Sequence, residues 1–326
     1  NLEISMSELT KFPGAFTAPI QSENGPIYVL GHKNPDTDSI VGAIAAANLY
    51  KGRGYDVKPV AQGKPAPETA FVLEKFNLDA PEVISSVAGK DFFLVDYADL
   101  KQAPEDFKEG KLLGIVDHHK LGDVSSDSPL ECWIWPVGSS NTILKVMHDF
   151  YGVELPKNIA GAMLCAILSD TLIFNSPTAT PLDKKVVEEL AKIAEVEDIE
   201  ALGMEMFKAK SNLNDTPKAL LNRDFKDFEM GEKKIGIGQL ELIAEDMVTP
   251  ELKAKLIEEM DKAKEEGRDD VVLVITDILK KGSRLMVVGP DAASIAETLG
   301  ADADMWMDGV LSRKKQIVPP LQKKFA

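Results

Sequence analysis

The sequence predicts an α/β protein of two domains, and three observations support this. At 326 residues the chain is longer than one hydrophobic core usually organises, and 44% of its residues are apolar. Short apolar runs alternate with helical periods from residue 26 to about residue 208, which is typical of a mostly parallel sheet flanked by helices. A small, polar stretch that ends in proline, AKSNLNDTP, then separates this part from a shorter one. We expect an N-terminal domain at 26–208, a linker at 209–217 and a smaller C-terminal α/β domain with a mixed sheet at 218–326.

In the N-terminal domain each apolar run is short enough for a strand, and segments with helical spacing lie between the runs. Residues 1–25 are rich in Ser, Pro, Thr and Gly, and we interpret them as an extension outside the core. Ser39 can cap the first helix, Ser139 or Ser140 a later one, and Asn158 an apolar helix that leads to Asp170. The expected strands are 26–30, 56–61, 92–95 and 112–116, and the expected helices are 39–49, 67–76, 140–151, 160–169, 181–194 and 198–208.

The C-terminal domain has several strand-like segments around one acidic and basic helix. The strand-like segments are FKDFEM at 225–230, KIGIGQLE at 234–241, DVVLVIT at 270–276 and LMVVG at 285–289. The helix is expected at 250–266, and a basic run, SRKKQIV, follows at 312–318.

Composition argues against several classes of partner. The chain has 53 acidic and 37 basic side chains, and its net charge of -16 disfavours nucleic acids and anionic lipid surfaces. No apolar run approaches the roughly 20 residues of a membrane helix, and the first residues lack the layout of a secretory signal. Cys132 and Cys165 lie far apart in apolar surroundings, which favours buried or free thiols. We therefore expect a cytoplasmic protein with no nucleic-acid and no membrane partner.

Histidines and aspartates gather where the apolar runs of the N-terminal domain end. Singly, each would be an ordinary turn residue or helix cap. Three of the four histidines, however, fall at the C-terminal ends of strands of one predicted sheet, the edge at which open α/β sheets bind ligands. The candidates are His32, Asp36 and Asp38 in GHKNPDTDS, Asp96, Asp117 with His118 and His119, and Asp170.

Imidazole and carboxylate ligands without thiolates suit divalent ions, with Mn²⁺ favoured and Co²⁺, Zn²⁺ or Mg²⁺ as alternatives. The carboxylates are too many for one ion. Two ions about 3.5–4 Å apart, sharing a bridging carboxylate, would neutralise them and could activate a bridging water for phosphoryl hydrolysis. His148, on the face of a predicted helix, is expected to be structural.

The motifs GHKNPDTDS, VDYAD, IVDHH and LSDT, in this order, resemble those of the DHH phosphoesterase superfamily. SRKKQ and NRDFKDFEM narrow the resemblance to the family II, manganese-dependent inorganic pyrophosphatases, over about residues 26–326. The resemblance implies a C-terminal domain of the DHHA2 type, an active site in the interdomain cleft, and a homodimer formed through an edge of the first domain.

The resemblance also implies a role for each candidate residue. His32 and Asp36 would hold the first metal, and Asp96 would bridge the two metals. The second metal would be held by Asp38, His118 and Asp170. His119 would face the substrate phosphate, and Asp117 would orient the site from behind the ligands.

The phosphate-gripping cations of the family correspond to Lys226, Arg313 and Lys314. They explain how an acidic protein could bind an anion, because metals and three cations supply a local positive field. Arg313 offers a planar fork for phosphate oxygens, whereas the lysines act as point charges. By composition alone, SRKKQ would be a solvated basic run.

The sequence departs from the family at VDYAD, where VDHNE is more usual. Asp96 is retained, but Tyr97, Ala98 and Asp99 replace His, Asn and Glu. We expect altered metal preference or affinity, because changes among the groups that surround metal ligands typically cost about 10–100-fold.

The resemblance implies hydrolysis of pyrophosphate to two phosphates by in-line attack of a metal-bridging hydroxide, with an additional Mg²⁺ entering with the substrate. The cleft would close on residues near Ser211 to Asn214. One alternative is a DHH phosphodiesterase acting on short oligonucleotides or a cyclic dinucleotide, but such relatives carry a GGGH-type motif that the sequence lacks. Another is a non-catalytic metal-dependent binding module, which would be expected to lose the basic residues.

Overall fold

The computed structural model describes residues 22–326, so most of the expected extension at 1–25 lies outside the described residues. The chain packs into two units. Within the described residues, the first unit comprises 22–174 and 179–203, and the second comprises 175–178 and 204–326. Each unit is described by itself below.

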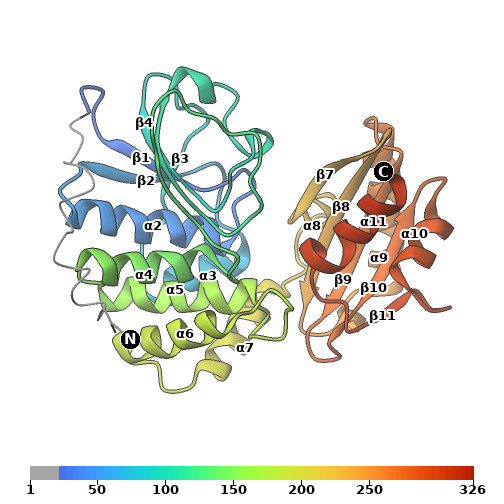
Figure 1. The fold of residues 1–326 in the computed structure, drawn as a ribbon. Coiled ribbons are helices and arrows are strands. Elements are labelled where there is room, and N and C mark those ends of the chain that lie inside the picture. Colours follow the sequence, from blue (N-terminus) through green and yellow to red (C-terminus); the bar gives the residue numbers. More distant parts are fainter. Residues whose placement is uncertain (1–21) are drawn as a thin grey trace, which may run out of the picture. The chain divides into compact units, whose positions relative to one another are not determined.

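The first unit contains a sheet of six strands in the order β3-β2-β1-β4-β5-β6, and every neighbouring pair is parallel (Figure 1). This confirms the α/β prediction. The edge strands β3 and β6 were not predicted, because they are short and carry glutamates. The strands are β1 (Ile27–Leu30), β2 (Val57–Ala61), β3 (Glu82–Val83), β4 (Asp91–Val95), β5 (Lys111–Asp117) and β6 (Glu131–Ile134).

The strand order reverses between β1 and β4. From β1 the chain adds β2 and β3 on one side, and it then returns to add β4, β5 and β6 on the other. At such a point the connections that follow the two strands diverge, which leaves a crevice at their C-terminal ends. The first unit therefore offers a ligand site beyond β1 and β4, next to β5.

Helices α2, α4 and α5 pack against one another beside the sheet, and α6 packs on α5 (Figure 1). Helix α5 is apolar all round and almost wholly buried, as a helix in the centre of such a layer must be. The helices are α2 (Thr37–Gly52), α3 (Pro67–Lys75), α4 (Ser140–Tyr151), α5 (Lys157–Asp170), α6 (Pro181–Ala194) and α7 (Ile199–Lys210), with short 3₁₀ turns η1 (Leu100–Gln102) and η2 (Phe107–Glu109).

Two predicted helix starts were wrong. Helix α2 begins at Thr37, because the carboxylate of Asp36 accepts a hydrogen bond from the backbone N–H of Ser39 at 2.9 Å and so caps the helix. Ser39 is therefore inside the first turn rather than at the cap. Helix α5 begins at Lys157 after Pro156, which leaves Asn158 inside its first turn. Ser139 does cap α4.

The second unit has a sheet of five strands in the order β11-β10-β9-β8-β7. Strands β8 and β9 are parallel and the other neighbours are antiparallel, which confirms the predicted mixed sheet. The strands are β7 (Phe225–Met230), β8 (Lys233–Leu242), β9 (Asp270–Asp277), β10 (Gly282–Val288) and β11 (Trp306–Asp308). The helices are α8 (Pro217–Leu221), α9 (Pro250–Glu265), α10 (Ala292–Leu299) and α11 (Val318–Phe325), with a 3₁₀ turn η3 (Glu245–Met247) and a π-helical turn η4 (Arg313–Ile317).

The strand β9 is buried along its whole length because both faces of this sheet are covered. Val272 and Val274 face the core that contains Ile295 of α10 and Leu321 of α11. The alternate residues of β9 face a second core, which is built with α8 and α9. The apolar run DVVLVIT predicted this buried strand correctly.

The segment that follows α7 is held by hydrogen bonds to other residues of the second unit. The guanidinium of Arg223 donates to the carbonyl oxygens of Lys210 and Asn212, each at 2.9 Å, and to the Asp215 carboxylate at 2.7 Å. The Ser211 hydroxyl accepts from the backbone N–H of Ile243 at 2.8 Å. A pivot at Ser211 to Asn214, the position expected from the sequence, would first have to break these bonds.

Candidate metal centre

His32 lies just beyond β1 and is buried. Its Nδ1 donates to the backbone carbonyl oxygen of Lys33 at 2.7 Å, so the lone pair that could bind a metal is on Nε2. Nε2 lies 3.3 Å from Oδ2 of Asp36 and 3.5 Å from Oδ2 of Asp96. These three side chains form one group that could hold a cation.

A second group gathers around His118, directly after β5. Its Nδ1 lies 3.1 Å from the carbonyl oxygen of Val137, so Nε2 again points at carboxylates. Nε2 lies 3.3 Å from Asp96 Oδ1, 3.4 Å from Asp170 Oδ2 and 3.9 Å from Asp38 Oδ2. The ligand atoms of Asp38, Asp96, His118 and Asp170 all lie within 4.8 Å of one another.

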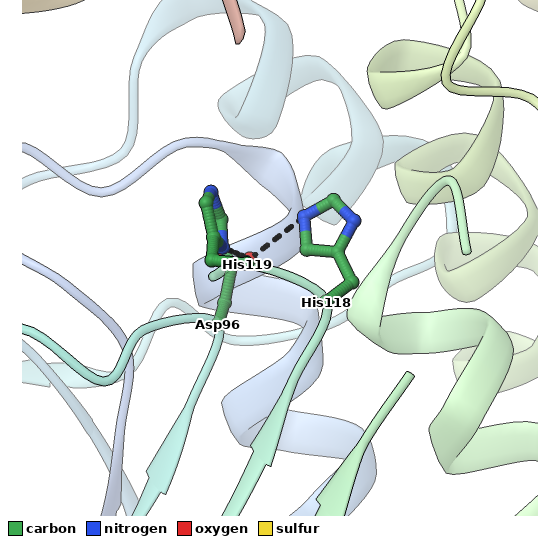
Figure 2. Close-up of side chains that lie close together, drawn as sticks. All are labelled: Asp96, His118 and His119. Atoms are coloured by element: carbon green, nitrogen blue, oxygen red, sulfur yellow. Dashed lines mark ion pairs between the residues drawn. The ribbon is translucent and has the colours of Figure 1, made fainter. Parts of the chain in front are cut away.

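Asp96 belongs to both groups and offers a different oxygen to each. Oδ2 faces His32 and Oδ1 faces His118. Figure 2 shows Asp96 at the end of its strand, close to His118 and His119. Its backbone adopts φ of 71°, a left-handed conformation that a non-glycine residue adopts at a cost. Backbone strain of this kind is concentrated at functional sites.

The spacing of the atoms within each group fits a bound divalent ion. A metal held at about 2.0–2.2 Å by nitrogen and oxygen ligands separates neighbouring ligand atoms by about 2.8–3.6 Å. The distances from His32 Nε2 and from His118 Nε2 to their nearest carboxylate oxygens, 3.3–3.5 Å, fall in this range.

The charges of the site also call for cations. Burial raises the pKa of Asp96 well above its usual value, and the nearby charges of Asp38 and Asp36 raise this pKa further. Ionised carboxylates this close together repel unless positive charge lies between them. Bound metals would supply that charge and hold the aspartates ionised.

Serine and asparagine side chains fix the carboxylates that face both groups. The hydroxyl of Ser39 donates to Oδ2 of Asp96 at 2.8 Å, and that of Ser140 donates to Oδ1 at 3.2 Å. Asp38 accepts hydrogen bonds from the Ser139 hydroxyl, from the backbone N–H of Ser140 and from Asn141 at the start of α4. From the sequence alone, these serines are expected only as helix caps. The signal was present in SSN, which lies at the start of a helix that packs on α2.

Glu68 ties two ligand-bearing elements together. Its carboxylate accepts from the Thr37 hydroxyl at 2.5 Å and from the Ser169 hydroxyl at 2.6 Å, and all three side chains are buried. Thr37 lies between two ligands of GHKNPDTDS and Ser169 precedes Asp170. Glu68 thereby connects the start of α2 to the end of α5, a role that nothing in the sequence indicates.

His119 is held differently from His118. Its Nδ1 and its backbone N–H both donate to Oδ1 of Asp117, at 2.8 Å and 3.0 Å, and Asp117 is buried. Nδ1 also lies 3.6 Å from Asp96 Oδ1, whereas the side chain is 27% exposed. Asp117 thus fixes the orientation of the imidazole, which remains partly exposed.

Tyr97 does not lie among the groups that surround the ligands. It is buried in the apolar core of the first unit with Ala98, and Asp96 takes side-chain hydrogen bonds from Ser39 and Ser140. Burial raises the pKa of the Tyr97 hydroxyl well above its usual range. An altered metal affinity, as expected from VDYAD, would therefore have to arise without a hydrogen bond from Tyr97 to Asp96.

The three expected phosphate-binding cations lie in the second unit. The guanidinium of Arg313 donates to the carbonyl oxygen of Ile237 at 3.1 Å, and Ile237 is the cross-strand partner of Lys226. The Lys226 ammonium has no hydrogen-bond or ion-pair partner among residues 22–326, and Lys314 is exposed. The second unit thus brings two of these cations to neighbouring positions and presents the third to solvent.

Comparisons with known proteins agree with this organisation. Residues 26–167 match the model of the DHH family N-terminal domain, and residues 204–324 match that of the DHHA2 domain. A probable manganese-dependent inorganic pyrophosphatase of Archaeoglobus fulgidus is 43% identical over 92% of this chain and 98% of its own length. The manganese-dependent inorganic pyrophosphatase of Methanocaldococcus jannaschii is 43% identical over 91% and 99%.

A crystal structure from Methanococcus jannaschii, of a protein assigned to the family II inorganic pyrophosphatases, is similar at a TM-score of 0.82 and 42% identity. The match covers 91% of this chain and 99% of that one. With both domain types matched in order and the relatives covered almost end to end, the chain belongs to the family II, manganese-dependent inorganic pyrophosphatases.

Proposed function

We propose that the protein hydrolyses inorganic pyrophosphate to two phosphates at a two-metal centre, with cations of the second unit gripping the substrate. Membership of the pyrophosphatase family gives the substrate and the dependence on manganese. The observation that carries the two-metal part is Asp96, whose two oxygens face two separate groups of ligands.

In this proposal His32, Asp36 and Asp96 hold one ion, and Asp38, Asp96, His118 and Asp170 hold the other. Metals bound there would neutralise the carboxylates and lower the pKa of a water so that it can attack phosphorus. The hydrogen bonds on Nδ1 of both histidines keep each Nε2 directed at its group, and the start of α4 keeps Asp38 in place.

His119 is proposed to contact the phosphate. Because Asp117 accepts from its Nδ1, Nε2 is the atom proposed to hydrogen-bond a phosphate oxygen or to hold a proton for it.

Lys226, Arg313 and Lys314 are proposed to take the end of pyrophosphate that the metals do not hold. The absence of an anionic partner for Lys226 among the described residues supports this, because a partnered lysine would have less charge to offer. An additional Mg²⁺ that enters with the substrate is part of the same proposal, since metal ions that bridge phosphate oxygens neutralise the charge that develops in phosphoryl transfer.

The domain division with the cleft between the two units, a homodimer and a cytoplasmic location remain proposals. Strand β6 is the outer strand of its sheet, and an apolar cavity of about 490 Å³ lies beside it, lined in part by Phe93, Trp133 and Phe150. An open edge next to an apolar surface favours pairing with a second copy. Light scattering on the full chain would distinguish one copy from two.

No helix within residues 22–326 is long and apolar enough to cross a membrane.

Phosphate release from pyrophosphate, measured after Mn²⁺ is restored to chelator-stripped protein, tests the proposal. The parent protein should release phosphate and leave bis-p-nitrophenyl phosphate intact, whereas a DHH phosphodiesterase would cleave the latter. Asp38→Asn should abolish release, because the second ion loses a charged ligand. Release that survives Asp38→Asn, or binding of metal and pyrophosphate without turnover in the parent, would reject the proposal.

A further inference from the structure

The segment that carries Arg313 and Lys314 is a closed loop, residues 309–316, and Gln316 at its end is part of SRKKQ. We propose that Gln316 is a positioning residue, whose side-chain amide fixes the backbone from which Arg313 and Lys314 reach the phosphate. This inference rests on the proposed function, because it assigns Gln316 a part in presenting those two cations.

The Gln316 amide makes three hydrogen bonds to the backbone of its own loop. Its Oε1 accepts from the N–H groups of Leu311 at 2.9 Å and Ser312 at 3.0 Å, and its Nε2 donates to the carbonyl oxygen of Gly309 at 2.9 Å. Only this orientation of the amide satisfies all three, because the reversed one would oppose donors to donors. No residue without both a carbonyl and an N–H group at this length can replace it.

The opposite side of the loop is fixed by a row of buried polar side chains on neighbouring strands. The Ser283 hydroxyl of β10 donates to the carbonyl oxygen of Val310 at 2.6 Å. Gln239 of β8 donates through Nε2 to the carbonyl oxygen of Leu311 at 3.2 Å and to the Thr276 hydroxyl of β9 at 2.9 Å. Buried polar groups on three strands of an apolar sheet are costly unless they have partners, and here two of those partners are loop carbonyls.

The backbone just ahead of Arg313 is therefore held from both sides. Both N–H groups at 311 and 312 bond to Gln316, and both carbonyls at 310 and 311 bond to the strands. The Ser312 carbonyl accepts from the backbone N–H of Gln316 at 2.8 Å. Without the Gln316 side chain, the N–H groups of Leu311 and Ser312 and the carbonyl of Gly309 lose these bonds together, and the loop can shift.

A shift of the loop would change how Arg313 can bind phosphate, because most of its N–H donors already bond to the protein. Both N–H groups of Nη1 point at carbonyl oxygens, of Asp224 at 2.7 Å and of Ile237 at 3.1 Å, and Nη2 donates to the Asp224 carboxylate at 2.6 Å. The remaining edge, Nε–H with the second Nη2–H, is a fork that fits two phosphate oxygens. Its direction depends on where the loop places the Arg313 backbone.

The test compares Gln316→Met with Gln322→Met in the full-length protein loaded with Mn²⁺. Methionine keeps the length of the side chain and removes the amide, and Gln322 of α11 is the matched control in the same unit. We expect kcat/KM for pyrophosphate to fall about tenfold or more in Gln316→Met, because small misplacements remote from the chemistry can cost as much as 10²-fold. Mn²⁺ affinity should stay within about twofold of the parent, since the metal ligands lie in the other unit.

A double-mutant cycle of Gln316→Met with Arg313→Lys distinguishes a positioning role of Gln316 from an effect on stability alone. If Gln316 acts through Arg313 and Lys314, the double variant should lose clearly less kcat/KM than the two single losses combined, and Ser283→Ala should reproduce part of the Gln316 loss from the other side of the loop. Additive losses, or an unchanged kcat/KM in a folded Gln316→Met, would overturn the inference. An unchanged kcat/KM in Arg313→Lys would instead refute the phosphate-gripping role in the proposed function.

Discussion

Removing either hydroxyl that bonds Asp96 should weaken the two metal sites unequally. Ser39 donates to Oδ2, which faces His32, and Ser140 donates to Oδ1, which faces His118. Ser39→Ala should therefore weaken the His32 group first, and Ser140→Ala the His118 group. Loss of a hydrogen bond to a metal ligand typically costs about 10–100-fold in metal affinity. The Ser39 bond is shorter, at 2.8 Å against 3.2 Å, so we expect the larger loss in Ser39→Ala.

Calorimetric titration of Mn²⁺ into chelator-stripped protein measures both sites without using activity. The parent should bind in two steps, and each variant should shift a different step. Combining Ser39→Ala with His32→Gln, which already disables the first group, should add little, whereas combining it with His118→Gln should add its whole effect. Identical shifts in both variants, or no shift in either, would refute the bridging geometry of Asp96.

Four further predictions concern single substitutions. Asp117→Asn should lower kcat for pyrophosphate by about 10²-fold or more and leave Mn²⁺ affinity unchanged, because His119 loses the carboxylate that holds its imidazole. Equal losses in kcat and in Mn²⁺ affinity would contradict this prediction. Burial lowers the pKa of His148, so the unfolded chain binds a proton more readily than the folded protein does. The free energy of unfolding should therefore decrease as the pH drops from about 6.5, the pKa of an unfolded histidine, toward the lower pKa of the folded state. His148→Leu should flatten this pH dependence in denaturant unfolding, and an unchanged dependence would contradict the prediction. Tyr97→His should lower the free energy of unfolding by about 1–3 kcal/mol, because it places a more polar ring in the core. Calorimetry should show an unchanged Mn²⁺ affinity; a changed affinity would instead support the expectation that VDYAD alters metal binding. Gly161→Ala would place a methyl group 2.0 Å from the Phe76 ring, so chemical unfolding should report a loss of about 1–3 kcal/mol, and a neutral result would show that α5 and Phe76 can move apart.

The sequence predicted which histidines and aspartates gather beyond β1, β4 and β5, because the ends of strands and helices are determined by nearby residues. Short apolar runs that stop at His32, Asp96 and His118 require those residues to meet if the strands are parallel neighbours, and β1, β4 and β5 are neighbours. The cap of α2 was misplaced because Asp36 and Ser39 are both good caps, and the choice depends on which side chain can reach back to a free N–H.

What the sequence could not predict are contacts between distant segments. The bonds from Ser140 to Asp96 and from Ser169 to Glu68 join residues far apart in the chain, and no periodicity encodes them. The burial of Tyr97 in the core could not be predicted for the same reason, since adjacency to Asp96 in sequence does not say which way a side chain points after a left-handed residue.

The central claim is that Asp96 joins two groups of metal ligands into one pyrophosphatase centre. The most direct test measures how phosphate release depends on the number of Mn²⁺ equivalents added per chain. Mn²⁺ would be added stepwise to chelator-stripped protein with pyrophosphate present, with tightly bound metal counted in parallel. We predict that release remains low after the first equivalent per chain and rises with the second. Full release with a single equivalent, or release from the stripped protein without any divalent ion, would contradict the account.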